Sequence, residues 1–294
     1  MLQSVSRVGL DAPRLDRDAP LHQLSLRLGK NRLSVDRQDP PWKVVRAFRA
    51  PDGSTLVHLN NVSGGVLAGD RLALDVEVEA GAAAQITTTG ATRLYRHRAG
   101  ATDSEQRTTI SIGDGALLEY LPDPLIPYAG SRHLQRTQIR LAKGATLFWW
   151  EILAPGRQAA GERFAFERLR LKTTIHACAR LLLKESFRLE PGERPLDSRA
   201  RMHDYSYLVN FYACRQGRPA AFWRSLEDKL SELAIARTRP GEAMWAASTL
   251  PSDGVIVRGL SSSNRFIHAT LIEFWSLARQ CMIGEPAIPP RKTY

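Results

Sequence analysis

The stretch Arg71–Thr89 reads RLALDVEVEAGAAAQITTT, and its pattern decides the fold. Its first half places apolar residues at every second position: Leu72, Leu74, Val76 and Val78. Such alternation is typical of a β-strand with one buried face. Gly81-Ala82 interrupts the pattern, since glycine supplies the positive φ that a tight turn needs, and a second strand is expected over residues 84–89. The stretch therefore predicts a strand–turn–strand unit.

The same arrangement recurs along the chain. Each copy has an apolar residue, then two intervening residues, then Gly-Ala: Val78 with Gly81-Ala82, Ile112 with Gly115-Ala116, and Leu141 with Gly144-Ala145. The copies are 34 and 29 residues apart, which is too irregular for a strict solenoid. Two arrangements fit this pattern, namely units stacked on each other or three ordinary hairpins in a sandwich. Both are mainly β, and we favour the stacked units.

After residue 195 the apolar residues follow a helical period. Pro219 suits a first helical position, and a helix is expected from there to just before Pro240-Gly241. A second helix is expected between the serines at 261–263 and Gly284. We expect both helices to pack against the sheet edges.

The predicted fold class is therefore mainly β, with stacked β-strands in a helical, solenoid-like arrangement and two α-helices in the C-terminal half. We expect residues 1–294 to form a single domain with a flexible N-terminus over residues 1–20.

The charge balance bears on the kind of partner. The chain has 41 Lys and Arg against 30 Asp and Glu, a net charge of +11, which admits nucleic acid, an acidic protein or an anionic surface. Residues 125–150 contain no acidic residue but hold four cations: Arg132, Arg136, Arg140 and Lys143. The alternative interpretation is one solvated strand face. Because no recognition helix, zinc finger or RNP-type aromatic motif accompanies the charge, we expect no nucleic-acid partner.

Other classes are disfavoured by what the sequence lacks. No apolar run is long enough to span a membrane, and the N-terminus lacks the apolar region of a secretory signal, so we expect a cytoplasmic protein without membrane attachment. The three cysteines are far apart, which disfavours a disulfide framework or a CxxC site. No phosphate-binding loop, dinucleotide fingerprint, nucleophile elbow or HExxH motif is present.

The least ordinary segment is NNVSGGVLAGD at residues 60–70, where two glycine clusters demand a tight turn or close backbone approach. Other motifs follow it in order: QITTT at 85–89, ATRLYR at 91–96, LEYLP at 118–122, WWEIL at 149–153, and Gly156-Arg157 with Gly161-Glu162. Together they resemble the urease accessory protein D family (UreD, called UreH in some bacteria). The resemblance covers roughly residues 40–294.

This resemblance implies a scaffold and not an enzyme. Members of the family bind nickel-free urease together with a UreF-type factor and a UreG-type GTPase, and they help to deliver Ni²⁺ to the urease active site. No cofactor is then bound permanently, and Ni²⁺ is cargo in transit. A divalent ion cannot cross an apolar core, so its route must be hydrated or lined by carboxylates.

The resemblance also suggests which residues line such a route. Asp70, Glu151 and Glu162 are the candidate acids, with Thr88 and Tyr95 as lining or interface positions. Each acid has an alternative role. Asp70 could cap the turn before its strand, Glu151 could face water from an ordinary strand, and Glu162 could pair with Arg157 or Arg163.

A docking face for the UreF-type partner is expected on the second helix, at four apolar residues: Phe266, Phe274, Trp275 and Leu277. Core packing within this chain explains these residues equally well.

Two alternative functions stay open at this point. A β-solenoid carbohydrate-active enzyme would need a carboxylate pair at a cleft, such as Glu119 with Glu151. A basic RNA-binding β module would show strongly salt-dependent binding.

Overall fold

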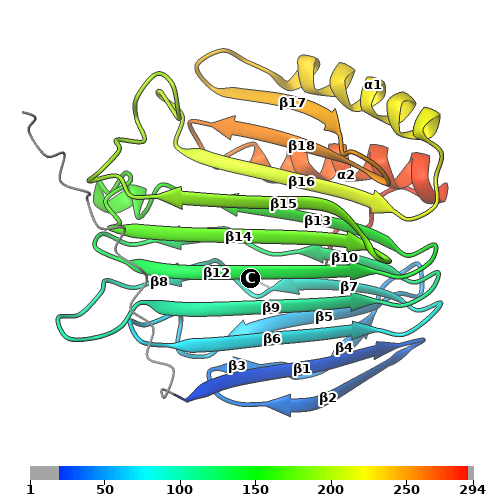
Figure 1. The fold of residues 1–294 in the computed structure, drawn as a ribbon, viewed down its shortest axis with the longest axis horizontal. Helices are drawn as coiled ribbons and strands as arrows, with labels where there is room; N and C mark the ends of the chain where they lie inside the picture. Colours follow the sequence, from blue (N-terminus) through cyan, green and yellow to red (C-terminus); the bar gives the residue numbers. More distant parts are fainter. Residues whose placement is uncertain (1–19, 291–294) are drawn as a thin grey trace, which may run out of the picture.

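The computed structural model describes residues 20–290, in which two β-sheets lie face to face (Figure 1). Sheet I has the strand order β15-β14-β12-β9-β6-β1-β2. Its strands are β1 (Leu21–Gly29), β2 (Arg32–Gln38), β6 (Arg71–Val78), β9 (Ser104–Ile112), β12 (Arg132–Leu141), β14 (Arg168–Ala177) and β15 (Arg180–Leu189). The N-terminal stretch expected to be flexible lies, except for Pro20, outside the described residues.

Sheet II has the strand order β17-β18-β16-β13-β10-β7-β5-β3. Its strands are β3 (Trp42–Lys43), β5 (Thr55–Asn61), β7 (Ala83–Thr88), β10 (Leu117–Leu121), β13 (Thr146–Leu153), β16 (Tyr207–Arg215), β17 (Ala243–Thr249) and β18 (Gly254–Ser261). Three short strands flank this path: β4 (Ala47–Arg49), β8 (Thr92–Leu94) and β11 (Leu125–Pro127).

Successive units of the chain stack in register. The pairs β6–β9, β9–β12 and β12–β14 in sheet I are parallel, as are β5–β7, β7–β10 and β10–β13 in sheet II. Val78 lies opposite Ile112, and Ile112 lies opposite Leu141, so the register reproduces the spacings of 34 and 29 residues. The two strands of one unit enter different sheets, unlike those of a hairpin. The mainly β fold of stacked strands with two C-terminal helices is thus confirmed.

The Gly-Ala turns form a column at one end of the stack, on the right in Figure 1. Gly81, Gly115 and Gly144 have φ angles of +66°, +62° and +68°, a region that side chains disfavour. The backbone N–H of Gly81 donates to the carbonyl of Asp114 in the next turn at 2.8 Å, and that of Gly115 donates to the carbonyl of Lys143 at 2.8 Å. The turn alanines are buried, so each turn forms a platform for the next.

Helix α1 (Ala220–Arg237) packs against β17, the edge strand of sheet II, as expected, whereas α2 (Ile267–Ile283) covers the outer face of the same sheet, so the expectation is wrong for α2. Helix α1 begins one residue after the expected Pro219, and α2 ends at Gly284. Their buried residues pack on the outward side chains of β10, β13, β16, β17 and β18 in one apolar cluster. The physical reason is that Phe148, Trp150 and Phe211 form a wide apolar face that needs covering.

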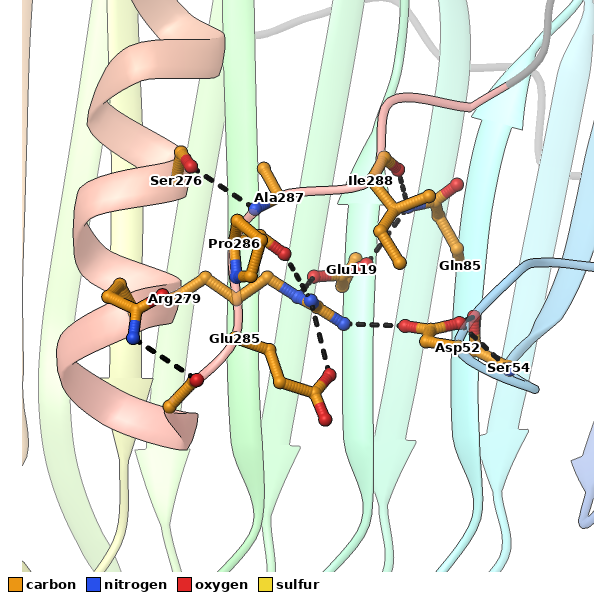
Figure 2. A network of polar contacts seen from close by, with 12 residues as sticks. Asp52, Ser54, Gln85, Glu119, Ser276, Arg279, Glu285, Pro286, Ala287 and Ile288 are labelled. Carbon is orange, nitrogen blue, oxygen red and sulfur yellow. Dashed lines mark hydrogen bonds and ion pairs between the residues drawn. The ribbon is translucent and has the colours of Figure 1, made fainter.

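A buried polar network fastens α2 and the segment after it to sheet II (Figure 2). The Glu119 carboxylate on β10 accepts hydrogen bonds from Arg279 Nε at 2.9 Å, Trp275 Nε1 at 3.0 Å and Gln85 Nε2 at 2.9 Å. Arg279 also donates to Asp52 Oδ2 at 2.5 Å and to the carbonyl of Pro286. Glu119 and Arg279 are each 1% exposed, so their charges depend on each other.

Replacing Arg279 with Met should lower the free energy of unfolding by about 3–5 kcal/mol, because Glu119 stays buried without a counter-ion. The double variant Glu119→Gln/Arg279→Met should recover part of that loss. Urea denaturation followed by tryptophan fluorescence measures both. The control is Arg237→Met, which removes the half-exposed ion pair with Glu273 between the two helices. Equal losses in Arg279→Met and Arg237→Met would contradict this assignment.

Candidate functional site: a polar cavity between the sheets

The inner face of sheet I changes from polar to apolar along its central strands. Gln106 and Thr108 precede Ile110 and Ile112 on β9, and β12 repeats this order with Gln135, Thr137, Ile139 and Leu141. The register aligns Thr108, Thr137 and Thr173 across three neighbouring strands. The half of the interior near the Gly-Ala turns is therefore apolar, and the half near the longer loops is polar.

A cavity of about 100 Å³ occupies this polar half. Sheet I contributes residues from β9, β12, β14 and β15, and sheet II contributes residues from β3, β5, β7, β10, β13 and β16. The cavity thus crosses successive strands along the axis of the stack. Its polar lining includes Asn61, Thr88, Asp123, Gln135, Glu151 and Asn210. A volume of this size has room for several water molecules.

Glu151 on β13 is the acid deepest in this cavity. Burial raises its pKa to about 8, and the nearby charge of Glu185 adds to that shift, while a hydrogen bond with Tyr212 opposes it. Gln135 Nε2 lies 3.4 Å from Glu151 Oε1. The carboxyl group of Glu151 is therefore mostly protonated at pH 7 and can exchange its proton for a cation.

Glu185 joins the two sheets beside Glu151. It lies on β15 of sheet I, and it accepts a hydrogen bond from the Tyr212 hydroxyl on β16 at 2.6 Å. It also forms an ion pair with Arg258 on β18. Glu151, Tyr212 and Glu185 thus form a chain of polar groups from the cavity to the half-exposed guanidinium of Arg258.

A second acid, Asp123, lines the cavity just after β10, the strand beside β13. The Thr88 hydroxyl donates to Asp123 Oδ2 at 2.9 Å, and the backbone N–H of Asp123 donates to Thr88 Oγ1 at 2.8 Å. His268 Nε2 on α2 lies 3.8 Å from Asp123 Oδ1. The cavity is therefore lined by two carboxyl groups from neighbouring strands together with hydroxyl and amide groups.

Two tryptophans indicate that the cavity holds water. Trp42 and Trp149 both line it, and within residues 20–290 their buried indole N–H groups have no hydrogen-bond acceptor. A buried donor without an acceptor costs about 1–3 kcal/mol, which water in a polar cavity offsets.

The glycine-rich segment organises a loop next to this cavity. Asn61 lines the cavity, and its Nδ2 donates to the carbonyl of Gly65 at 3.0 Å. A Cβ atom on Gly65 would lie 2.5 Å from the carbonyl oxygen of Arg93 and 2.6 Å from the Tyr95 ring, so only glycine fits there. Asp70 Oδ2 accepts a hydrogen bond from the backbone N–H of Leu67 at 2.8 Å, so its carboxylate caps the turn.

Glu162 and Tyr95 belong to a separate cluster of loop residues. The Tyr95 and Tyr128 rings meet edge to face with centroids 5.2 Å apart, and the Arg157 guanidinium lies 4.5 Å from the Tyr128 centroid. Arg157 Nε donates to Glu162 Oε1 at 3.0 Å, and this hydrogen bond lowers the pKa of Glu162. Of the five predicted path residues, the structure thus brings only Glu151 and Thr88 to the cavity.

Comparisons with known protein sequences show the family of this chain. A family model described as "UreD urease accessory protein" matches residues 20–294. The chain belongs to the UreD family. A urease accessory protein UreD of Herpetosiphon aurantiacus is 43% identical over 270 residues, which cover 92% of this chain and 94% of that protein. The UreD of Pseudomonas aeruginosa (strain UCBPP-PA14) is 35% identical over 256 residues, which cover 87% of this chain and 86% of that protein.

The contacts described above give a structural role to three of the sequence motifs. LEYLP supplies Glu119 to the buried network, WWEIL supplies Glu151 to the cavity, and the glycine-rich segment supplies Asn61. Glu119 contacts α2 on the outer side of sheet II, whereas Glu151 lines the cavity on its inner side. The two carboxylates therefore do not flank one cleft, as the carbohydrate-active alternative requires.

The proposed docking residues on α2 have different environments. Phe274 and Trp275 are fully buried in the cluster between the helices and sheet II, and Leu277 packs against the same cluster. The core-packing alternative thus accounts for Phe274 and Trp275, which offer no surface to a partner in the folded chain. Phe266, just before α2, is 53% exposed.

Residues missed at the level of sequence are Asp123, Glu185 and Asn210. Glu185 had a readable signal, since it occupies the inward phase of β15 between Leu183 and Phe187, where an apolar residue is expected. Asn210 had no such signal, because the sequence of β16 does not show which side of the strand lines the cavity.

Two further findings concern metal binding and membrane spanning. Within residues 20–290, no group of three or more His, Cys, Asp or Glu residues is placed to hold a metal ion. In the same part of the chain, no helix has both the length and the apolar character needed to cross a membrane.

The pKa of Glu151 gives a direct prediction. Its folded-state pKa of about 8 exceeds its ordinary value of 4.5, so the folded chain holds an extra proton between these pH values and loses stability as pH rises from 4.5 to about 8. We expect Glu151→Gln to stabilise the chain more at pH 9 than at pH 6. Denaturation at both pH values measures this difference, with Glu162→Gln as the control. An identical effect at both pH values would contradict a raised pKa.

Proposed function

We propose that this chain is a scaffold in urease maturation, which binds nickel-free urease together with UreF-type and UreG-type partners and passes Ni²⁺ to urease through the cavity between its sheets. Membership of the UreD family supports the maturation role. The single observation that carries the route is the polar cavity, which crosses successive strands along the axis of the stack and is lined by Glu151 and Asp123.

The ligands in the cavity suit passage better than retention. Ni²⁺ binds nitrogen and sulfur ligands tightly, whereas isolated carboxylate, amide and hydroxyl oxygens hold it weakly. The cavity supplies such oxygens singly or in pairs, and among residues 20–290 no His or Cys lines it. An ion that keeps part of its water shell can therefore move from one oxygen to the next without being trapped.

Glu151 can act as a proton-coupled step on this route. At neutral pH its carboxyl group is mostly protonated, which spares the interior an unpaired negative charge. An entering Ni²⁺ favours the carboxylate and displaces the proton to water in the cavity. When the ion leaves, the carboxyl group takes up a proton again, so no fixed charge holds the cargo.

The other predicted path residues have supporting roles in this proposal. Thr88 holds Asp123 at the cavity, and Asp70 and Tyr95 shape the glycine-rich loop that positions Asn61. Glu162 fixes the neighbouring loop through Arg157. None of these roles requires catalysis, in keeping with a protein that assists another enzyme.

The maturation role is tested by producing urease with and without this chain, with all other accessory proteins present. We expect nickel-poor, inactive urease without the chain and restored nickel with it, measured as nickel per urease by mass spectrometry. Equal nickel content in both preparations would contradict the role.

The route is tested by Glu151→Gln, which removes the exchangeable proton and the anionic ligand without changing the volume. We expect nickel per urease to fall several-fold, whereas Glu232→Gln, at an exposed position of α1, should stay near wild type. Full nickel loading with a folded Glu151→Gln variant would contradict the route.

A further inference from the structure

The outer face of sheet I is uncovered by any helix of the described residues. Both helices lie on sheet II, and the outward side chains of β9, β12, β14 and β15 include five exposed cations: Arg107, Arg136, Arg140, Lys172 and Lys184. We call these five residues the basic face. They include Arg136 and Arg140 of the acid-free stretch at 125–150.

The parallel register places like charges directly beside each other. Arg136 lies opposite Arg107 on one neighbouring strand and opposite Lys172 on the other, so three cations form one row across three strands. Adjacent parallel strands lie about 4.8 Å apart, and like charges on neighbouring strands destabilise a sheet. The fold alone gives no reason for this row.

Neutralising acids are scarce on the same four strands. The one outward acid is Glu105, which contacts Arg136 at 3.2 Å and also Arg71 on β6 at 3.8 Å. Within residues 20–290, the side chains of Arg107, Arg140, Lys172 and Lys184 form no ion pair. Four cations without an ion pair on these strands make a positive local potential, which is bordered by the acids Asp75 and Glu77 on β6 and Glu79 just after it.

We propose that the basic face is a docking surface for an acidic face of nickel-free urease. This inference rests on the proposed function, which requires the chain to contact urease, and it assigns the surface and its chemistry. Charge complementarity argues for an acidic partner, and Thr109, Gln138 and Thr174 between the cations offer hydrogen bonds.

A protein fits this surface better than a nucleic acid. The outward positions of the four strands carry no Phe, Tyr or Trp, so bases have no aromatic platform on which to stack. The surface is also a flat sheet without a projecting helix to enter a DNA groove.

The test is the double variant Arg107→Glu/Lys172→Glu, compared with Arg224→Glu/Lys229→Glu on the exposed side of α1. Both change the net charge by the same amount. Binding of each full-length variant to purified nickel-free urease is measured at two salt concentrations, with thermal melting of each variant alone.

We expect the basic-face variant to bind urease at least about tenfold more weakly at low salt, and to lose most of the salt dependence of wild type. The α1 variant should bind as wild type does. The basic-face variant should also melt no lower than wild type, because it replaces like-charge neighbours of Arg136 with opposite charges. Weaker binding thus cannot be attributed to a lost fold.

Three outcomes would overturn the inference, and they are distinguishable. If the wild-type chain does not bind nickel-free urease, the scaffold function itself fails. If wild type binds and the basic-face variant binds equally well, only the docking surface is wrong. If both variants weaken equally, the surface has no specific role in urease binding.

Discussion

In-register parallel stacking is the constraint on which the rest of this structure depends. The backbone N–H groups of Gly81 and Gly115 each donate to a carbonyl of the next turn, and the positive φ of each turn glycine lets the chain cross from sheet I to sheet II without a bulky corner. Because every unit then has the same phase, side chains line up in columns. A polar inward column makes the cavity, and a cationic outward row makes the basic face.

The repeat in the sequence was sufficient to predict this stacking, because a turn needs glycine locally and the strand phase continues from it. The placement of the helices was not predictable in the same way. The helices pack on apolar residues of sheet II such as Phe148 and Phe211. These residues point away from sheet I, because the opposite side of their strands packs against sheet I. Phe274 and Trp275 are buried for the same reason.

The candidate site was predicted in part. Glu151 and Thr88 line the cavity, whereas the carboxylates of Asp70 and Glu162 make local contacts that alternative interpretations of the sequence already allowed. Glu185 and Asp123 reach the site through contacts between elements distant in sequence. Periodicity can show that a polar residue stands at a strand position where an apolar residue is expected. It cannot identify which residue of the opposite sheet that polar residue contacts.

The central claim is that the interior of the stack carries Ni²⁺ to urease, and narrowing the cavity tests it most directly. Thr137→Leu adds apolar volume inside the cavity, and Ser248→Leu adds apolar volume at an exposed position of the edge strand β17, away from both the cavity and the basic face. With both variants folded and bound to urease, the account predicts nickel-poor urease for Thr137→Leu and normal nickel for Ser248→Leu. Normal nickel content with Thr137→Leu would contradict it.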